Sequence, residues 1–275
     1  MTPLLAATVR LATPLMLAST GGVLSERAGV AQLALEGMML TGAYVAVASG
    51  GGLPGALAAG VVGSACGGTM GLVVERFHGS ALLAGIGINL LAAGATTFLL
   101  RSHPGGALGG ARLVDVEWFA GVALLGVAAV AAALKRFPIG LRIRACGENP
   151  LAARAAGITV SRVRTGTLAV SGAFAGLAGA ALVLAGLGEF TENMTGGRGY
   201  LAVVAVLLGR WRPLPVALAA LLFGFGDALQ LWLRNEGSTV PADIQEMLPY
   251  ALALVVLGAG RRSTGEPGSL ARDGE

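Results

Sequence analysis

Long apolar runs alternate with short polar connectors along most of this chain. A helix needs about 20 mostly apolar residues to cross the hydrocarbon core of a bilayer. One group of runs reaches or approaches that length with at most one charged residue in each: Leu4–Gly22, Leu53–Val74, Ser80–Leu100, Trp118–Leu134, Thr165–Gly188, Pro213–Leu233 and Ile244–Gly260. The pattern therefore predicts an all-α membrane protein.

Two further apolar pieces, Gly37–Ser49 and Tyr200–Gly209, are shorter and can either span the bilayer or re-enter it. With them, the pattern predicts about nine transmembrane or re-entrant helices. Their surroundings are alike, because an Arg and a Gly stand close before each piece, and a Pro and a long Gly/Ala-rich run follow it. Matching interruptions in two halves of a chain are typical of inverted-repeat transporters.

The composition supports a membrane location. Hydrophobic residues make up 55% of the chain and charged residues only 12%, whereas a soluble domain carries about 25% charged residues. Lys135 is the only lysine. The formal net charge of +4 could favour nucleic acid, but the basic residues are concentrated in one connector between apolar runs. We therefore expect contact with lipid and not with nucleic acid.

Signatures of soluble enzymes are scarce. No glycine-rich phosphate-binding loop ends at Lys135, so the chain is not expected to hydrolyse ATP by that route. His78 and His103 lie in different connectors, which disfavours a metal site or a histidine-based triad. Cys66 lies in an apolar run and Cys146 in a basic connector, and neither has a partner at ligand spacing. We expect no disulfide, metal or cofactor.

The connector 135–164 is the longest, and its Lys and Arg residues greatly outnumber its single acid, Glu148. Such an excess marks cytoplasmic connectors, so 135–164 is predicted to lie in the cytoplasm. Alternation then places the N-terminus outside and the C-terminus inside. Residues 1–262 form the predicted transmembrane domain, without a clear signal-peptide cleavage site, and the polar residues 263–275 form a disordered cytoplasmic tail.

Small residues recur at helical spacing in two of the long runs. Gly63, Gly67 and Gly71 form consecutive Gly-x-x-x-Gly steps, and Ser171, Ala175 and Gly179 form a similar ridge. Such ridges let helix backbones approach closely in a membrane, so we interpret Gly63, Gly67, Gly71 and Gly179 as packing residues. Small residues also leave room for a permeation path, which stays an alternative.

Polar residues inside apolar segments are costly and often functional. Asn89 lies in the middle of one run, where it fits either interhelical hydrogen bonding or a place on a solute path. Glu36 opens a short segment and Asp227 lies late in another. Both also fit as structural anchors near a membrane interface.

The connector segment Arg142–Ile158 has its own helix signals. Asn149 can cap a helix that begins at Pro150, since proline lacks the amide that would be unpaired there. Gly157 is a natural stop. The connector thus presents a short Ala-rich helix, which is either an ordinary surface helix or a plug that fits a groove on a partner protein.

Taken together, the motifs resemble those of permeases of bacterial ABC importers of the branched-chain amino acid and simple-sugar class, with the nearest likeness to nucleoside or simple-sugar permeases. The resemblance covers Leu11 to about Gly260, and four stretches carry it: Glu36–Ala43, Gly147–Ile158, Met194–Tyr200 and Met247–Tyr250. It implies a permease architecture of the type II importers in the bacterial inner membrane. It also implies three kinds of partner: a second permease, cytoplasmic ATP-binding subunits and an extracytoplasmic substrate-binding protein.

The sequence offers two sets of candidate residues, of which the first rests on the resemblance. The segment around Asn149 takes the place of the family's coupling helix, which contacts the ATPase, with these residues: Arg144, Gly147, Glu148, Asn149, Pro150, Ala153, Arg154 and Gly157. The candidate translocation path has these residues: Glu36, Asn89, Thr195 and Arg198. The expected solute is a nucleoside or a simple sugar, carried without any catalytic residue in this chain.

Three alternatives stay open on the sequence alone. A secondary transporter driven by an ion gradient needs an internal ion site, and Asp227 is the only carboxylate well inside a long run. A branched-chain amino acid permease would share the same family features. An intramembrane enzyme is disfavoured because paired catalytic residues are missing.

Overall fold

The computed structural model describes residues 3–103, 108–186 and 188–235, together with residues 247, 251, 267, 268 and 270. The described ranges contain ten α-helices and no strand beyond two isolated bridges. The helices are α1 (Pro3–Arg27), α2 (Leu35–Ala48), α3 (Gly52–Arg76), α4 (Ala81–Arg101), α5 (Val116–Arg136), α6 (Pro138–Glu148), α7 (Pro150–Ala155), α8 (Val160–Leu184), α9 (Arg198–Leu208) and α10 (Pro213–Asn235).

Six of the described helices are long and apolar enough to cross a membrane: α1, α3, α4, α5, α8 and α10. An all-α membrane protein is therefore confirmed. The short apolar helices α2 and α9 do not reach that length, as their segments predicted. The predicted helix Ile244–Gly260, the motif Met247–Tyr250 and the tail 263–275 lie outside the described residues, except for the isolated residues given above.

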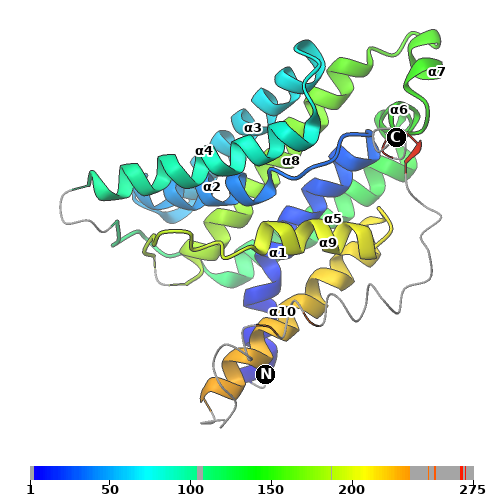
Figure 1. Ribbon diagram of the computed structural model, residues 1–275. Coiled ribbons are helices and arrows are strands. Elements are labelled where there is room, and N and C mark those ends of the chain that lie inside the picture. Colours follow the sequence, from blue (N-terminus) through cyan, green and yellow to red (C-terminus); the bar gives the residue numbers. More distant parts are fainter. Residues whose placement is uncertain are drawn as a thin grey trace.

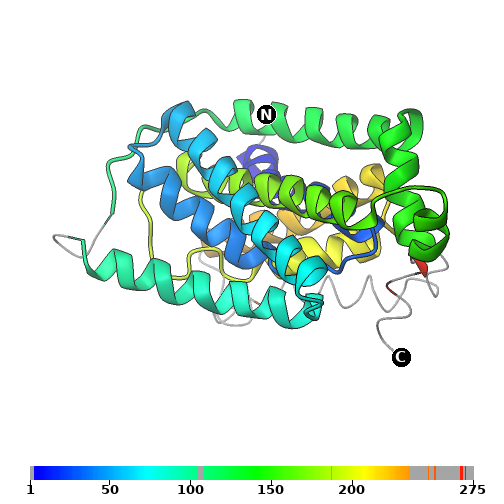
Figure 2. The ribbon, with the colours of Figure 1, turned by 90° about the horizontal axis from the view of Figure 1, so that it is seen from above.

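The helix α8 lies inside the bundle, where it packs against α1, α2 and α3. Figure 2 shows α4 and α5 along opposite edges of the molecule, with the other long helices and the two short ones between them. α3 packs along much of α8, and α10 packs along α1. The core consists mainly of small and aliphatic side chains, with Phe119 and Phe223 the largest that are fully buried.

Glycine determines how closely α3 and α8 pack. A side chain at Gly63 would overlap the Gly172 carbonyl, and one at Gly67 would overlap the Leu168 carbonyl. A Cβ at Gly71 would lie 2.8 Å from the Cα of Thr165. These three glycines thus lie in a row on the side of α3 that faces α8. Such a row brings helix backbones into contact.

Gly179 makes a comparable contact on another face of α8. A side chain there would overlap the Met39 carbonyl in α2, and its Cβ would lie 2.7 Å from the Ala43 amide. The short helix α2 therefore rests directly on the backbone of α8.

The connectors gather at two opposite ends of the bundle. At the end that carries α7, called the α7 end below, Gly147 of α6 approaches Arg27 so closely that a side chain would overlap the Arg27 carbonyl. In the same region the Trp211 indole donates a 2.6 Å hydrogen bond to the Glu26 carboxylate. Figure 1 shows α6 and α7 together at this end, away from the N-terminus.

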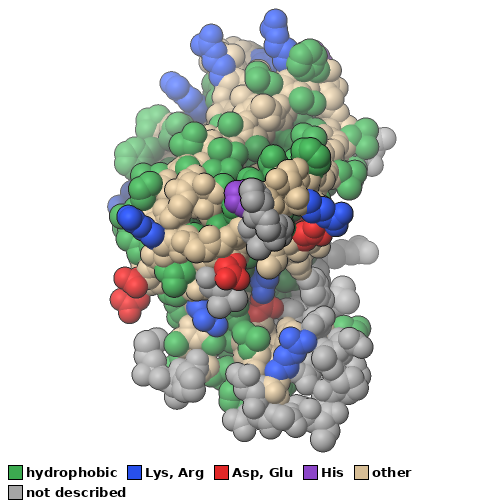
Figure 3. All heavy atoms as spheres, turned by 90° about the vertical axis from the view of Figure 1, so that its left-hand side faces the viewer, with side chains coloured by type: hydrophobic (Ala, Val, Ile, Leu, Met, Phe, Trp, Pro, Cys, Tyr) green, Lys and Arg blue, Asp and Glu red, His purple; other side chains and the backbone are tan. Residues whose placement is uncertain are grey.

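At the opposite end, short bridges tie three connectors together. Gly51 pairs with Arg112, and Leu108 pairs with Phe190. Arg101 and Glu192 form an exposed ion pair of 2.8 Å. Figure 3, which views the left-hand side of Figure 1, shows hydrophobic side chains over much of the described surface, with acidic and basic groups between them.

Candidate functional site

The first turns of α2 and α9 meet at the buried carboxylate of Glu36. One carboxylate oxygen accepts hydrogen bonds from the Thr195 hydroxyl at 2.6 Å and from the Gly197 amide at 2.9 Å. The other oxygen accepts a 2.6 Å hydrogen bond from the Gly199 amide. Amides at the N-terminus of a helix lack partners within that helix, so a side chain of α2 caps α9.

Close backbone contact makes this capping possible. A side chain at Gly199 would overlap the backbone of Glu36, so only glycine allows the two first turns to touch. Gly197 precedes α9 with a φ of 81°, a left-handed conformation that glycine adopts without strain. Gly197 and Gly199 thus position their amides around the carboxylate.

Asn89, near the middle of α4, extends the network. Its side-chain oxygen accepts a 2.8 Å hydrogen bond from the Gly37 amide. Its side-chain nitrogen donates to the Leu33 carbonyl at 2.8 Å and to the Tyr200 hydroxyl at 3.1 Å. Asn89 therefore ties α4 to the chain entering α2 and to the first turn of α9.

Arg198, the first residue of α9, links the network to α10. Its Nη2 atom lies 3.4 Å from Oδ2 of Asp227 in α10, and both side chains are largely buried. The structure thus brings Glu36, Asn89, Thr195 and Arg198 together around the starts of the two short helices. Asp227, which the sequence left as a possible anchor, joins them as the ion partner of Arg198.

Gln32 adds a polar group that the sequence analysis did not single out. It is fully buried, and its side-chain nitrogen donates a 3.1 Å hydrogen bond to the Ser171 hydroxyl in α8. Within the described part of the chain, its side-chain oxygen has no hydrogen-bond partner, and neither has Nε of Arg198. Unpaired buried polar atoms are rare in folded proteins. The Gln32 oxygen can still accept a hydrogen bond, and Nε of Arg198 can still donate one.

The arrangement concentrates polar groups where the bundle is otherwise apolar. Hydrogen bonds to a charged carboxylate are shorter and stronger than neutral ones, and the positive end of the α9 dipole favours the negative charge of Glu36. Interrupted helices whose ends meet inside a membrane bundle form the solute sites of many transporters.

The short helix α7 has the ends that its sequence predicted. The Asn149 side-chain oxygen accepts 3.1 Å hydrogen bonds from the amides of Leu151 and Ala152, and Pro150 occupies the first helical position. Gly157 follows the helix with a φ of 80°. A side chain at this position would be strained by the backbone conformation although the space around it is open.

One face of α7 is fixed to the bundle and the other is exposed. Ala153 is buried in a small apolar cluster with Cys146 and Val160. Burial raises the pKa of the Cys146 thiol, so this residue is a packing element and not a reactive thiolate. Leu151 and Arg154 are exposed, and Leu151 leaves 68% of its surface uncovered.

The other coupling candidates surround α7. Arg144 lines a cavity that also contains Arg27, Lys135 and Trp211. Glu148 ends α6 directly before the Asn149 cap. The α7 end therefore presents a largely basic surface around a short capped helix.

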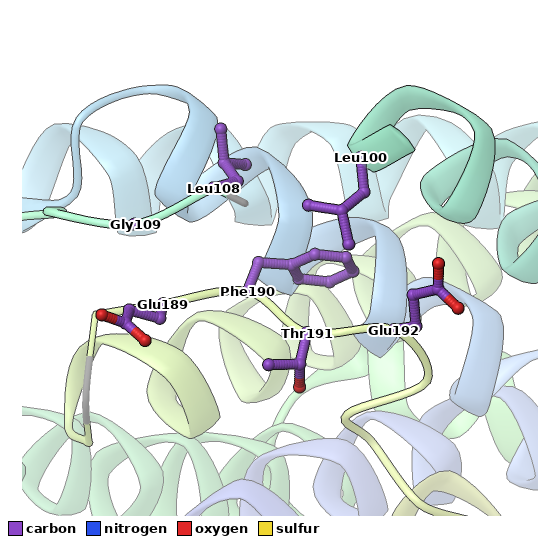
Figure 4. Close-up of a pocket in the computed structure, with 7 residues that line it drawn as sticks. All are labelled: Leu100, Leu108, Gly109, Glu189, Phe190, Thr191 and Glu192. Carbon is purple, nitrogen blue, oxygen red and sulfur yellow. The ribbon is translucent and has the colours of Figure 1, made fainter. Parts of the chain in front are cut away.

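A second cavity, of about 410 Å³, lies at the opposite end of the molecule. Figure 4 shows the Phe190 ring close to Leu100, with Leu108 beyond it and with Glu189 and Glu192 on either side. A hydrogen bond from Arg101 lowers the pKa of the exposed Glu192 carboxyl. This cavity shares no residue with the Glu36 network.

Several contacts of the site escaped the sequence analysis. Gln32 lies in a short connector, where polar residues are ordinary, so nothing in the local pattern distinguished it. Tyr200 stands out in the sequence only as the last residue of the stretch Met194–Tyr200. The described residues contain no cluster of three or more His, Cys, Asp or Glu side chains that could hold a metal ion.

Comparison with known proteins places the chain in a family. The sequence profile described as "Branched-chain amino acid transport system / permease component" matches residues 4–257. The chain belongs to this permease family. The six long apolar helices agree with a multi-pass membrane protein of this kind.

Several curated relatives of the chain are transporter permeases. The guanosine ABC transporter permease protein NupQ of Bacillus subtilis is 32% identical, over 91% of this chain and 89% of its own length. The nucleoside ABC transporter permease protein NupC of Lactococcus lactis is 28% identical, over 89% of this chain and 88% of its own. The glucose ABC transporter permease protein TsgB13 of Haloferax volcanii is 29% identical, over 90% and 73%. No solved structure gives a significant match.

Proposed function

We propose that this permease subunit works in an ATP-driven importer and forms the path for a small polar solute, a nucleoside or a simple sugar. The observation that carries the proposal is the polar network where α2 and α9 meet, with Glu36, Asn89, Thr195 and Arg198 in it. The relatives named for guanosine, nucleoside and glucose transport support the same solute class.

The network also argues against a carboxylate-bearing solute such as a branched-chain amino acid. In transporters with interrupted helices, free helix N-termini bind the substrate carboxylate. Here the Gly197 and Gly199 amides already bond to Glu36. A second carboxylate at this place would meet a like charge, which is unfavourable in a poorly solvated site. An uncharged solute with hydroxyl and amide groups avoids that repulsion.

The helix α7 is the proposed contact with separate ATP-hydrolysing subunits. Its Asn149 cap and Gly157 stop fix a short rigid element, and Leu151 and Arg154 are exposed for a partner. Ala153 packs with Cys146 and Val160, and Gly147 lies against Arg27, so both hold this region to the bundle. The proposal includes Arg144, Glu148 and Pro150, which lie beside or within α7. We therefore assign these residues to coupling and none of them to solute binding.

Charge at the two ends supports an orientation. The α7 end carries many basic residues, among them Arg27, Lys135 and Arg144 around one cavity, and such an excess is typical of the cytoplasmic side. The opposite end carries Glu189 and Glu192. On this basis α7 faces the cytoplasm of a bacterial cell, the N-terminus lies outside the inner membrane, and the tail 263–275 lies inside.

The proposed architecture is an inverted repeat with about nine spanning or re-entrant helices. Each half has a long, a short and a long helix: α1, α2 and α3 in one, and α8, α9 and α10 in the other. The packing supports this pairing, because α3 lies along α8 while α10 lies along α1. The two short helices then occupy corresponding places, and their first turns meet at Glu36.

Large apolar side chains on the outer faces of α3, α4 and α5 are exposed, including Leu57, Leu90, Leu91, Phe98 and Leu125. Exposed apolar surface of this kind marks contact with lipid or with another membrane subunit. The proposed partners are a second permease, two ATP-binding subunits and an external substrate-binding protein.

Purification of the chain from its native membrane tests this assignment. A tagged chain should carry ATP-hydrolysing subunits through two purification steps, and the complex should hydrolyse ATP faster when solute is present. A chain that purifies alone and still transports solute in liposomes would instead identify a self-sufficient secondary transporter.

A further inference from the structure

Arg164, near the start of α8, joins three parts of the chain at the α7 end. Its Nε atom donates a 3.1 Å hydrogen bond to the Ala28 carbonyl. Its Nη1 atom donates a 3.1 Å hydrogen bond to Glu75 at the end of α3. The Arg164 and Glu75 side chains retain only 15% and 7% of their exposure. The planar guanidinium can hold both partners at once, which a lysine ammonium cannot do with the same geometry.

Ala28 begins the connector 28–34, which leads directly into the Glu36 network. Gln32 of this connector bonds to Ser171, and the Leu33 carbonyl accepts a hydrogen bond from Asn89. Glu36 follows within the first turn of α2. A displacement of the connector at Ala28 therefore acts within a few residues on the polar groups at the start of α2.

The connector 28–34 and the residue before it are also contacted by Gly147, which precedes α7 in the sequence. Gly147, at the end of α6, lies against the Arg27 carbonyl and the Gly29 amide. The helix α7 is thus flanked in sequence by Gly147 before it and Arg164 after it, and both contact the same short stretch of chain. A movement of α7 can therefore reach the connector through Gly147 or through Arg164. Of these two contacts, only that of Arg164 is made by a side chain.

The connector borders a cavity at the α7 end. Gly29, Val30 and Ala31 line a cavity of about 660 Å³ together with Arg154 of α7 and Arg164. The cavity thus borders one part of the connector, whereas Ser171 and Asn89 hold its later residues Gln32 and Leu33 by hydrogen bonds.

We infer that Arg164 is a positioning residue that transmits movement of α7 to the connector 28–34, and through it to the polar site at α2 and α9. The inference rests on the proposed function, since it requires a partner that moves α7. It adds a specific mechanical link that the coupling helix alone does not provide. Glu75 orients the guanidinium, and the Ala28 carbonyl receives the displacement.

The test uses Arg164→Lys in the assembled transporter, reconstituted in liposomes with its external binding protein. Lysine keeps a positive charge beside Glu75, so we expect folding and the ion pair to be preserved. It loses the second hydrogen bond, which Arg164 donates to the Ala28 carbonyl. We expect unchanged assembly and basal ATP hydrolysis, and a fall of about five- to tenfold in solute carried per ATP hydrolysed. Arg162→Lys, an exposed arginine two positions earlier, should behave as the parent.

A second readout follows the connector itself. Ala31→Cys, in a chain with Cys66 and Cys146 replaced by serine, should react with a thiol reagent at a rate that changes when ATP is added. Arg164→Lys should abolish that change. If Arg164→Lys does not assemble, the double variant Glu75→Gln/Arg164→Gln, which leaves no unpaired charge, replaces it.

Two results would overturn the inference. The first is that the Arg164 variant carries as much solute per ATP hydrolysed as the parent. The second is that the labelling rate at position 31 of the parent does not change when ATP is added. Failure of the proposed function is a separate outcome, because the parent complex would then show no ATP hydrolysis to compare.

Discussion

The Thr195 hydroxyl donates a 2.6 Å hydrogen bond to the Glu36 carboxylate across 159 positions of sequence. This contact joins the start of one short helix to the residues that lead into the other. It makes Glu36 a structural cap of α9 as well as a candidate residue of the solute path.

Glu36→Gln should destabilise the protein although the two side chains have the same shape. One end of the glutamine becomes an NH₂ group, which would face an amide donor from Gly197 or Gly199 and could not accept its hydrogen bond. Hydrogen bonds to charged groups contribute about 1.5–3 kcal/mol, so we expect a loss of about 2 kcal/mol in the free energy of unfolding. Thermal unfolding in detergent measures it.

The matched control for Glu36→Gln is Glu117→Gln, since Glu117 is an exposed residue of α5. It should leave the unfolding temperature unchanged. Equal unfolding temperatures for both variants would show that Glu36 does not cap α9.

Gly67→Leu and Gly68→Leu form a second matched pair in α3. A side chain at Gly67 would overlap the Leu168 carbonyl of α8, whereas a Cβ at Gly68 would meet no other atom within 4 Å. Overpacking costs about 1–3 kcal/mol and occasionally more. We expect Gly67→Leu to fall sharply in membrane abundance and thermal stability, with Gly68→Leu near the parent. Normal abundance of Gly67→Leu would refute the packing role.

Much of this fold could be predicted from the sequence because apolar length is a strong signal. The runs that became α3, α4 and α5 contain no charge, and the small-residue spacing in the runs of α3 and α8 predicted close packing. The Asn149-Pro150 start and Gly157 stop of α7 were equally readable, since capping depends on local residue chemistry.

The site was only partly predictable. Glu36 and Asn89 stood out as polar residues in apolar segments, but their bonds to Gly199 and Tyr200 depend on how α2, α4 and α9 meet in space. The link from Arg164 to Ala28 gave no signal at all, because an arginine in a basic connector is ordinary. Long-range partners of this kind are set by tertiary packing and not by local pattern.

Cysteine labelling tests the proposed orientation. Arg154→Cys lies on the exposed part of α7, and Arg112→Cys lies in an exposed connector at the opposite end. In intact cells, a thiol reagent that cannot cross the membrane should label position 112 and not position 154, in a chain whose native cysteines are serine. Equal labelling of both positions would contradict the proposed topology.

Gly157→Trp should disrupt coupling. The residue adopts a φ of 80°, which tryptophan tolerates poorly, and the bulky ring would project into open space beside α7. We expect loss of solute-stimulated ATP hydrolysis or loss of the ATPase subunits, with the bound solute class unchanged.

Gly157→Asn is the control for this effect, since asparagine adopts left-handed backbone more readily than other side chains and adds little bulk. It should keep most of the activity. A Gly157→Trp transporter that couples normally but carries a different solute would remove α7 from the coupling role.

We propose that ATP hydrolysis on partner subunits drives import through this chain. The most direct test measures uptake of labelled guanosine and glucose into liposomes that contain the purified complex and its external binding protein. We expect uptake of at least one solute only with ATP present on the α7 side, and no uptake when a proton or sodium gradient replaces ATP. Uptake that requires the ion gradient and does not depend on ATP would show that the chain is not part of an ATP-driven importer.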